Sequence, residues 1–269
     1  MDCTPGSMRL LICISLALCL VGQDNPLADR ERVRVALDKM QVRSKQRDVF
    51  LYQRRYTKRE LSSDGRLKSQ TVLTMRRDPW SEQTVDRIIA RDDKPLPPDE
   101  TVRQEEKLRR LVEERRRNPP KPKEDENSWM DELPDALDFH KAGVELRHNR
   151  PADVFEFKPH SGYKARQMRA RAFEKISGKV WIDQQDGEMT KLDVYVFDTI
   201  NIGFGMLGRV EKGTVFEIER KKWDVGVWFE EWQRVRFELR VMMVKTIRQE
   251  LENHWSNLSL HSGAKFSHP

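Results

Sequence analysis

The fold is decided by the alternating stretch Arg234-Val235-Arg236-Phe237-Glu238-Leu239-Arg240-Val241. Charged and apolar side chains follow one another through it without interruption, and successive side chains of a β-strand point to opposite faces of a sheet. The stretch therefore predicts a strand with one dry face and one wet face, which is typical of antiparallel sheets that are covered on one side only.

Similar strand-forming runs recur along the chain and are separated by turn sequences such as Ser62-Ser63-Asp64-Gly65 and Gln184-Gln185-Asp186-Gly187. The expected strands are 49–56, 70–75, 85–90, 144–146, 154–158, 180–183, 192–197, 214–220, 225–240 and 246–252. So many strands with hairpin-like turns predict a long antiparallel sheet. Such a sheet is expected to curve, with its concave side closed by helices or filled with an apolar ligand.

The sequence also predicts helices. Asn25-Pro26 is a typical helix start, because Asn accepts free backbone N–H groups and Pro fits the first helical turn. The residues after it form an apolar stripe at helical spacing: Leu27, Val33, Ala36, Leu37 and Met40. A short helix is expected at 133–142. Another is expected at 164–177, with Ala165, Met168, Ala172 and Ile176 as its apolar stripe and Gly178 at its end.

A charge-dense segment interrupts the strand pattern at about 98–126. Few apolar residues occur between Asp99 and Glu124, and Pro119-Pro120 would end any helix formed there. The segment is interpreted as a charged helical insertion that projects into solvent.

Composition limits the classes of protein to which the chain can belong. It has 269 residues, with 50 Lys+Arg against 44 Asp+Glu, and 35% of its residues are charged. No apolar run reaches the roughly 18 residues that a membrane-spanning helix needs. Thirteen Gly and thirteen Pro without a period exclude a collagen-like chain.

The N-terminal segment resembles an export signal. Arg9 precedes an apolar block from Leu10 to Val21, and the polar sequence Gly22-Gln23-Asp24 follows it. We therefore expect a signal segment at 1–22 and a single exported domain at 23–269; the alternative is a buried core helix. Cys3, Cys13 and Cys19 all lie in this segment, so the mature chain would lack thiols. Leu16-Ala17-Leu18-Cys19 also resembles a lipoprotein cleavage box, apart from Leu18, which leaves membrane anchoring through a lipidated Cys19 open.

Motifs that would indicate catalysis or a cofactor lack their required context. Gly203-Phe204-Gly205-Met206-Leu207-Gly208 matches a dinucleotide-binding pattern, but strand-forming residues follow it instead of a helix. It is interpreted as a loop or an edge strand. The histidines lack metal-ligand spacing, and no nucleophile elbow occurs. The sequence predicts no enzyme, no cofactor and no metal site.

The stretch at 164–175 carries basic residues that are candidates for contact with an anionic membrane surface: Lys164, Arg166, Arg169, Arg171 and Lys175. The alternative is a helix that packs on the sheet and leaves these charges in water. Nucleic-acid binding is not expected, because the signal segment indicates export and acidic residues are mixed through most other basic stretches.

Three motifs in succession resemble a known group of proteins. They are Phe155-Glu156-Phe157-Lys158-Pro159, Gly162-Tyr163-Lys164 and Gly178-Lys179-Val180-Trp181-Ile182-Asp183. Their order, between 27 and 255, is similar to that of the LolA-like periplasmic proteins related to outer-membrane lipoprotein sorting. The resemblance implies an unclosed antiparallel β-barrel wrapped around helices, with an apolar cavity that shelters acyl chains.

These observations lead to one prediction of fold and function. The fold class is α+β, with a large curved antiparallel sheet whose concave face is covered by helices. The expected function is periplasmic binding of a lipid or a lipoprotein acyl chain. The alternative is a non-enzymatic module of the same fold that senses envelope stress and docks an envelope or membrane-anchored protein.

The candidate cavity residues are apolar side chains from the later strands. Each of them could equally belong to an ordinary core. They are Val180, Ile182, Leu192, Val194, Val196, Phe216, Ile218, Val235, Phe237, Leu239 and Val241.

Overall fold

The computed structural model describes residues 25–45, 47–80, 83–118, 128–202, 208–241 and 244–261. The expected signal segment, with Cys3, Cys13 and Cys19, lies outside the described residues, as does Gly203–Leu207 of the glycine pattern. Gly208 begins strand β10, which pairs with β9 on one side and with β12 on the other and is therefore not an edge strand. In the described part of the chain, no helix is both long and apolar enough to cross a membrane.

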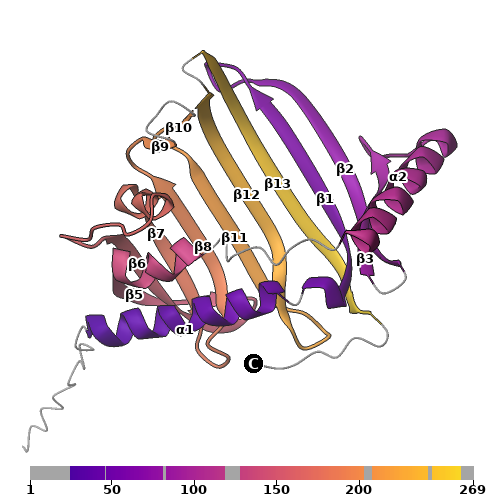
Figure 1. Cartoon of the computed structure of the whole chain (residues 1–269). Coiled ribbons are helices and arrows are strands. Elements are labelled where there is room, and N and C mark those ends of the chain that lie inside the picture. The colour runs from indigo at the N-terminus through magenta and orange to yellow at the C-terminus, as the bar shows by residue number, and fades with distance from the viewer. Residues whose placement is uncertain are drawn as a thin grey trace, which may run out of the picture.

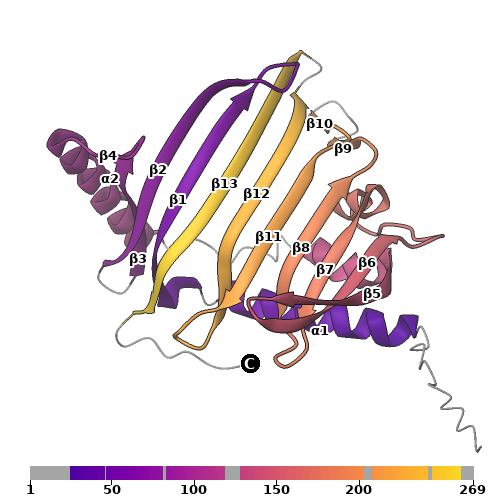
Figure 2. The same cartoon turned by 180° about the vertical axis from the view of Figure 1, so that it is seen from behind.

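One large antiparallel sheet forms the body of the protein (Figures 1 and 2). Among the described residues it has thirteen strands, in the order β4-β3-β2-β1-β13-β12-β11-β8-β7-β6-β5, with β10 pairing to β12 and β9 to β10. The end strands β4 and β5 are not paired with each other, so the sheet is curved but unclosed. The predicted fold class is confirmed. The strands are β1 (Phe50–Leu61), β2 (Leu67–Trp80), β3 (Gln83–Arg91), β4 (Lys94–Pro95), β5 (Leu137–Arg147), β6 (Arg150–Pro159), β7 (Ile176–Asp183), β8 (Met189–Val196), β9 (Ile200–Ile202), β10 (Gly208–Val210), β11 (Val215–Lys222), β12 (Trp228–Val241) and β13 (Lys245–Leu260).

Helix α1 crosses one face of this sheet. It lies in front of the strands in Figure 1 and behind them in Figure 2. Its start is as expected, because the Ala28 amide donates a hydrogen bond to Oδ1 of Asn25 at 3.2 Å. The helical segments are α1 (Pro26–Lys45), α2 (Pro98–Arg117), α3 (Leu133–Ala136) and the 3₁₀ turns η1 (Arg47–Val49), η2 (Ser128–Glu132) and η3 (Arg169–Lys175).

Two expected helices are wrong in length and type. Of the helix expected at 133–142, only α3 forms, and β5 begins at Leu137. The helix expected at 164–177 is reduced to the 3₁₀ turn η3, in which Ala170 and Phe173 are buried while Met168 is exposed. Ile176 pairs with Val196 in the sheet. Pairing with β6 therefore overrides the helical pattern from Leu137 onward. In the second segment only Ile176 and Ser177 join the sheet, and 169–175 form a 3₁₀ turn.

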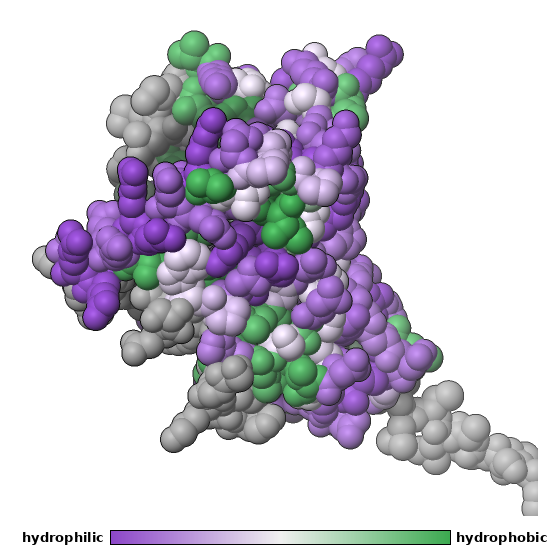
Figure 3. Space-filling view, turned by 90° about the vertical axis from the view of Figure 1, so that its right-hand side faces the viewer, coloured by the Kyte–Doolittle hydropathy of each residue, from purple (hydrophilic) through white to green (hydrophobic). Residues whose placement is uncertain are grey.

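The charged insertion forms helix α2, as expected, and buries none of its residues. It covers the β3 edge: the Gln104 amide accepts a hydrogen bond from the Ile88 N–H at 2.7 Å and donates one to the Ile88 carbonyl at 2.9 Å. Arg87 and Glu105 form an ion pair beside it. Figure 3, which views the molecule from this side, shows mostly hydrophilic residues with separate apolar patches. The helix thus protects a sheet edge against pairing with another chain.

The face of the sheet that meets α1 is apolar. The register places Val180 beside Leu192 and Leu192 beside Ile218, and it places Val194 beside Phe216 and Phe216 beside Val235. These side chains pack with Val33 and Ala36 of α1 and with phenylalanines of β5 and β6 into the main core, and Val235 continues the same rows onto β12. We call this face the inner face.

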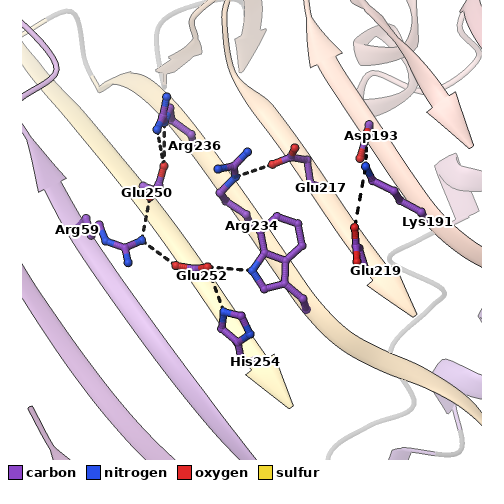
Figure 4. A network of polar contacts seen from close by, with 11 residues as sticks. Arg59, Lys191, Asp193, Glu217, Glu219, Arg234, Arg236, Glu250, Glu252 and His254 are labelled. Atoms are coloured by element: carbon purple, nitrogen blue, oxygen red, sulfur yellow. Dashed lines mark hydrogen bonds and ion pairs between the residues drawn. The ribbon is translucent and has the colours of Figure 1, made fainter. Parts of the chain in front are cut away.

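The opposite, outer face carries a network of charged side chains (Figure 4). Arg59 bridges Glu250 and Glu252 at 2.8 Å each, and Arg234 contacts Glu217 at 2.5 Å. Lys191 lies 2.9 Å from Asp193. Because β-strands alternate between faces, the same strands that make the apolar rows also make this network.

Gly178 allows three strands to approach closely. A Cβ atom placed there would lie 1.9 Å from the carbonyl oxygen of Asp193 and 2.7 Å from the Phe157 ring. The residue is paired with Phe157 on one side and Val194 on the other. Its role is therefore to permit strand packing in β7, and the expectation that it ends a helix is wrong.

We predict that Gly178→Ala destabilises the protein by roughly 1–3 kcal/mol, because the added methyl group overpacks a site bounded by backbone. Chemical denaturation measures the loss. Ser177→Ala, the neighbouring position in β7, serves as the control and should change stability little. Equal stability of the two variants would contradict this explanation of Gly178.

The outer network also predicts a dependence of stability on pH. Burial raises the pKa of Glu252, but hydrogen bonds from Trp232, Arg59 and His254 outweigh that effect and lower the pKa to about 2. A carboxylate with a lowered folded-state pKa stabilises the fold above its unfolded pKa, and this contribution is lost as the pH falls. Unfolding free energy should therefore decrease between about pH 4.5 and pH 2, and Glu252→Gln should flatten that part of the profile. An unchanged profile in Glu252→Gln would contradict the assignment.

Candidate functional site

The candidate site is an apolar groove between α1 and η2. Its volume is about 520 Å³, which lies within the usual range for small-molecule sites. The apolar part of the wall is made by Leu37, Met40, Trp129, Met130 and Pro134. The polar part of the wall comes from one side of α1 and from η2: Arg34, Asp38, Gln41, Ser44 and Asp131.

The groove is continuous with the core of the inner face. Leu37 and Met40 of α1 and Trp129 and Met130 of η2 also pack against the buried core cluster. Trp129 stacks on Phe173 of η3, with ring centroids 5.2 Å apart. The apolar wall of the groove is thus the solvent-facing layer of the same apolar cluster that α1 covers.

A buried carboxylate fixes the η2 wall. Glu132 is 2% exposed. It accepts hydrogen bonds from the Tyr163 hydroxyl at 2.7 Å, from the Arg166 amide at 2.9 Å and from the Gln167 amide at 3.1 Å. Burial and the Glu132 carboxylate raise the pKa of Tyr163, so its hydroxyl stays protonated and keeps donating. These bonds tie the segment before η3 to η2 and hold Trp129 in place.

Helix α1 is held over the sheet by ion pairs as well as by apolar contacts. Near its start, Arg32 lies 2.7 Å from the buried carboxylate of Asp153, which Lys141 also contacts at 2.9 Å. Burial raises the pKa of Asp153, but Gln184, Lys141 and Arg32 lower it overall, so the carboxylate stays charged. Further along, Lys39 donates a hydrogen bond to the Asp186 carbonyl at 2.7 Å.

A third buried carboxylate, Glu188, lies under the end of α1. Arg43 donates to Glu188 at 2.7 Å, and Arg220 lies 3.4 Å from the other oxygen of Glu188. Arg220 and Glu188 are each 2% exposed. Arg220 also donates to the carbonyls of Met189 and Trp228. Burial lowers the pKa of Arg220, while Glu230 and Glu188 act in the opposite direction. Removing one partner from such a group leaves a buried charge uncompensated.

The predicted cavity residues occupy the inner face but do not line this groove. Val180, Ile182, Val196 and Ile218 are buried, and Leu192, Val194 and Phe216 pack around the core. The four β12 residues Val235, Phe237, Leu239 and Val241 are half-buried. Contact of these residues with a ligand stays a prediction.

The residues proposed for a membrane surface lie around η3. Lys164, Arg166, Arg169 and Arg171 are exposed, whereas Lys175 is half-buried and donates to Asp198 at 2.8 Å. The side chain of Arg166 also lies 3.6 Å from Glu132. The structure brings these residues to one part of the surface without the helix that was expected to present them.

Sequence reasoning missed the η2 side of the groove. Leu37 and Met40 were recognisable from helical spacing, but Trp129-Met130 stands alone between charged residues and shows no period. Only the tertiary contact between η2 and α1 gives this pair a role. In the described residues, no group of three or more His, Cys, Asp or Glu side chains is arranged to hold a metal ion.

No family model matches the sequence, and no curated protein sequence matches it. Solved structures do show a likeness. An outer membrane lipoprotein-sorting protein domain from Vibrio parahaemolyticus has 11% identity and a TM-score of 0.37, with 90% of this chain and 95% of that chain covered. A LolA superfamily protein from Nitrosomonas europaea has 8% identity and a TM-score of 0.25, with coverage of 79% and 86%.

A third structure is the MucA/MucB complex of Pseudomonas aeruginosa, with 9% identity, a TM-score of 0.24 and coverage of 85% of this chain and 100% of that chain. The first two structures carry the names of the group that the sequence motifs resemble. All three TM-scores lie below 0.5, so the function is argued from the residues of this chain alone.

We predict that Glu188→Ala destabilises the protein by about 3–5 kcal/mol, because the buried Arg220 would lose the carboxylate that it contacts at 3.4 Å and would keep only the more distant charge of Glu230 beside it. Thermal or urea unfolding measures the change. Glu31→Ala, which removes a carboxylate from an exposed α1 ion pair, is the control and should have little effect. A small effect of Glu188→Ala would show that the buried pair does not anchor α1.

Proposed function

We propose that the chain binds a lipid or a lipoprotein acyl chain in the periplasm, with the groove between α1 and η2 as the binding site. The observation that carries the proposal is the continuity of the groove with the apolar inner face. An acyl chain that lies against Met40 and Met130 contacts side chains that themselves pack on the core.

The energetics of the groove favour an apolar guest. Each buried methylene group contributes about 0.8 kcal/mol, so roughly eight of them supply about 6 kcal/mol before the cost of ordering the ligand. Methionine side chains adapt their shape to the ligand, which suits a site that accepts acyl chains of different lengths. Arg34 and Gln41 lie where a polar end of the ligand would face water.

The location in the periplasm is supported by the sequence alone. The apolar block from Leu10 to Val21 is typical of an export signal, and we propose 23–269 as the exported domain. Anchoring through Cys19 remains an alternative for the N-terminus. Mass spectrometry of the mature N-terminus distinguishes cleavage near Gly22 from lipidation of Cys19.

The groove and the β12 rows can be tested together by titration with a fluorescent fatty acid. Met130→Asp should weaken binding at least tenfold, because a carboxylate in the groove would lose its hydration when the chain enters. Phe237→Asp should abolish binding if the acyl chain also reaches β12. Leu27→Asp is the matched control: it places the same charge on a residue of α1 that is 76% exposed, and it should bind normally.

Circular dichroism of each variant establishes that it is folded. Normal binding by a folded Met130→Asp protein would overturn the groove as the site. Loss of binding in Met130→Asp but not in Phe237→Asp would show that the acyl chain occupies the groove and does not reach β12. Mass spectrometry of the purified protein provides an independent check. A lipid-free protein that co-purifies with a stable protein partner would favour the alternative of a sensing module.

A further inference from the structure

A second surface feature lies at one corner of the sheet, where β9 and β10 meet the end of β12 (Figure 1). A hollow of about 610 Å³ at this corner is lined by Arg209, Lys212 and Arg240 among other polar residues. A second hollow of about 350 Å³ is lined by Met168 and Arg171 and shares Lys175 and Asn201 with the first. The shared residues make the two hollows neighbours that join η3 to the β9–β10 hairpin.

The corner has an excess of positive charge. Among the described residues, Arg209, Lys212 and Arg240 form no ion pair, and the Nε atom of Arg209 is buried without a hydrogen-bond partner. Arg209 and Arg240 are direct cross-strand neighbours in the register of β10 and β12. Like charges in that position destabilise a sheet unless an anion neutralises them.

Carboxylates near the hollow are largely engaged elsewhere. Asp198 accepts a hydrogen bond from Lys175 at 2.8 Å, and Glu238 pairs with Arg248 at 2.7 Å. Glu211 accepts a hydrogen bond from the Thr199 hydroxyl at 3.0 Å. Glu174, in the neighbouring hollow, is exposed. The Thr199 hydroxyl is neutral and leaves the charge of Glu211 in place, and Lys212 helps to lower the pKa of Asp198. The first hollow is therefore lined by four cations, Lys175, Arg209, Lys212 and Arg240, and by three carboxylates, Asp198, Glu211 and Glu238.

Exposed apolar side chains surround the same corner. Met168 is 55% exposed and Phe197 42%. Ile202 is 44% exposed, but its pairing with Gly208 places it on the opposite face from Arg209 and Arg240. Val244, which is 90% exposed, follows the end of β12, where Val241 pairs with Gly208 of β10. Apolar residues beside unpaired cations are typical of surfaces that lie in the interface of a lipid bilayer.

We propose that this corner docks the protein on a membrane surface that contains anionic phospholipids. Arg209, Lys212 and Arg240 face the phosphate groups, and Val244, which follows the end of β12, enters the boundary between headgroups and acyl chains. A soluble phosphate would satisfy the cations but would leave the apolar residues in water. The proposal is independent of the acyl-chain groove, because the groove shares no lining residue with either hollow.

The test is co-sedimentation of the proposed exported domain, residues 23–269, with vesicles. Vesicles of phosphatidylglycerol and phosphatidylcholine should bind the protein, and vesicles of phosphatidylcholine alone should not. Binding should weaken as salt is added, because exposed charges are screened. Lys212→Glu with Arg240→Glu should reduce binding at least about tenfold, since each cation near an anionic surface contributes appreciably. Val244→Asp should also reduce it.

The matched control is Arg109→Glu with Arg110→Glu. It makes the same change in net charge at exposed residues of α2, which covers the β3 edge and does not contribute to the corner. This variant should bind like the unmodified protein. Binding to phosphatidylcholine alone, equal losses in both double variants, or full binding by Lys212→Glu with Arg240→Glu would each overturn the proposal. Excess inorganic phosphate should compete only weakly, and full displacement by it would indicate a soluble-anion site instead. Fatty-acid titration of the same variants should stay normal, which separates this proposal from the acyl-chain function.

Discussion

The structure depends on the alternation of apolar and charged residues along its strands. Because neighbouring side chains point to opposite faces, each strand that contributes to the apolar inner face must also contribute to the charged outer face. On the outer face the charges neutralise one another, as between Arg59 and the pair Glu250 and Glu252. The apolar side chains of the inner face cannot satisfy one another through ion pairs. They must be covered by another part of the chain or by a ligand.

Helix α1 provides part of that cover, and it does so with an unusual balance of forces. Among the α1 side chains that the structure describes, Val33 and Ala36 are fully buried, while Arg32 and Arg43 reach buried carboxylates on the sheet. Charged contacts require specific geometry, so they fix the position of the helix more sharply than apolar packing alone. The helix therefore lies at a defined place over β5 to β8 and leaves a groove toward η2.

The two proposed surfaces follow from the same architecture. The groove is where the covering segments α1 and η2 leave a gap beside the core, and its chemistry is apolar. The corner at β9 and β10 is where the strand pairing passes from β11 to β10 along β12, and its chemistry is cationic with exposed apolar residues. A protein with both features can hold an acyl chain in the groove and contact a bilayer with the corner.

The sequence by itself determined the sheet, the faces of its strands, the start of α1 and the charged helix α2. Each of these depends on local periodicity or on a helix cap, and local patterns are visible in a single chain. Only the tertiary structure decided the conformation of 133–142, where strand pairing replaced most of the expected helix, and of 164–177, where a 3₁₀ turn replaced it. It also decided the groove, because Trp129 and Met130 acquire neighbours through contacts with α1 that are distant in sequence. The tertiary structure also decided that Arg209 and Arg240 form no ion pair among the described residues. The sequence shows which residues carry charge but not which charged side chains meet.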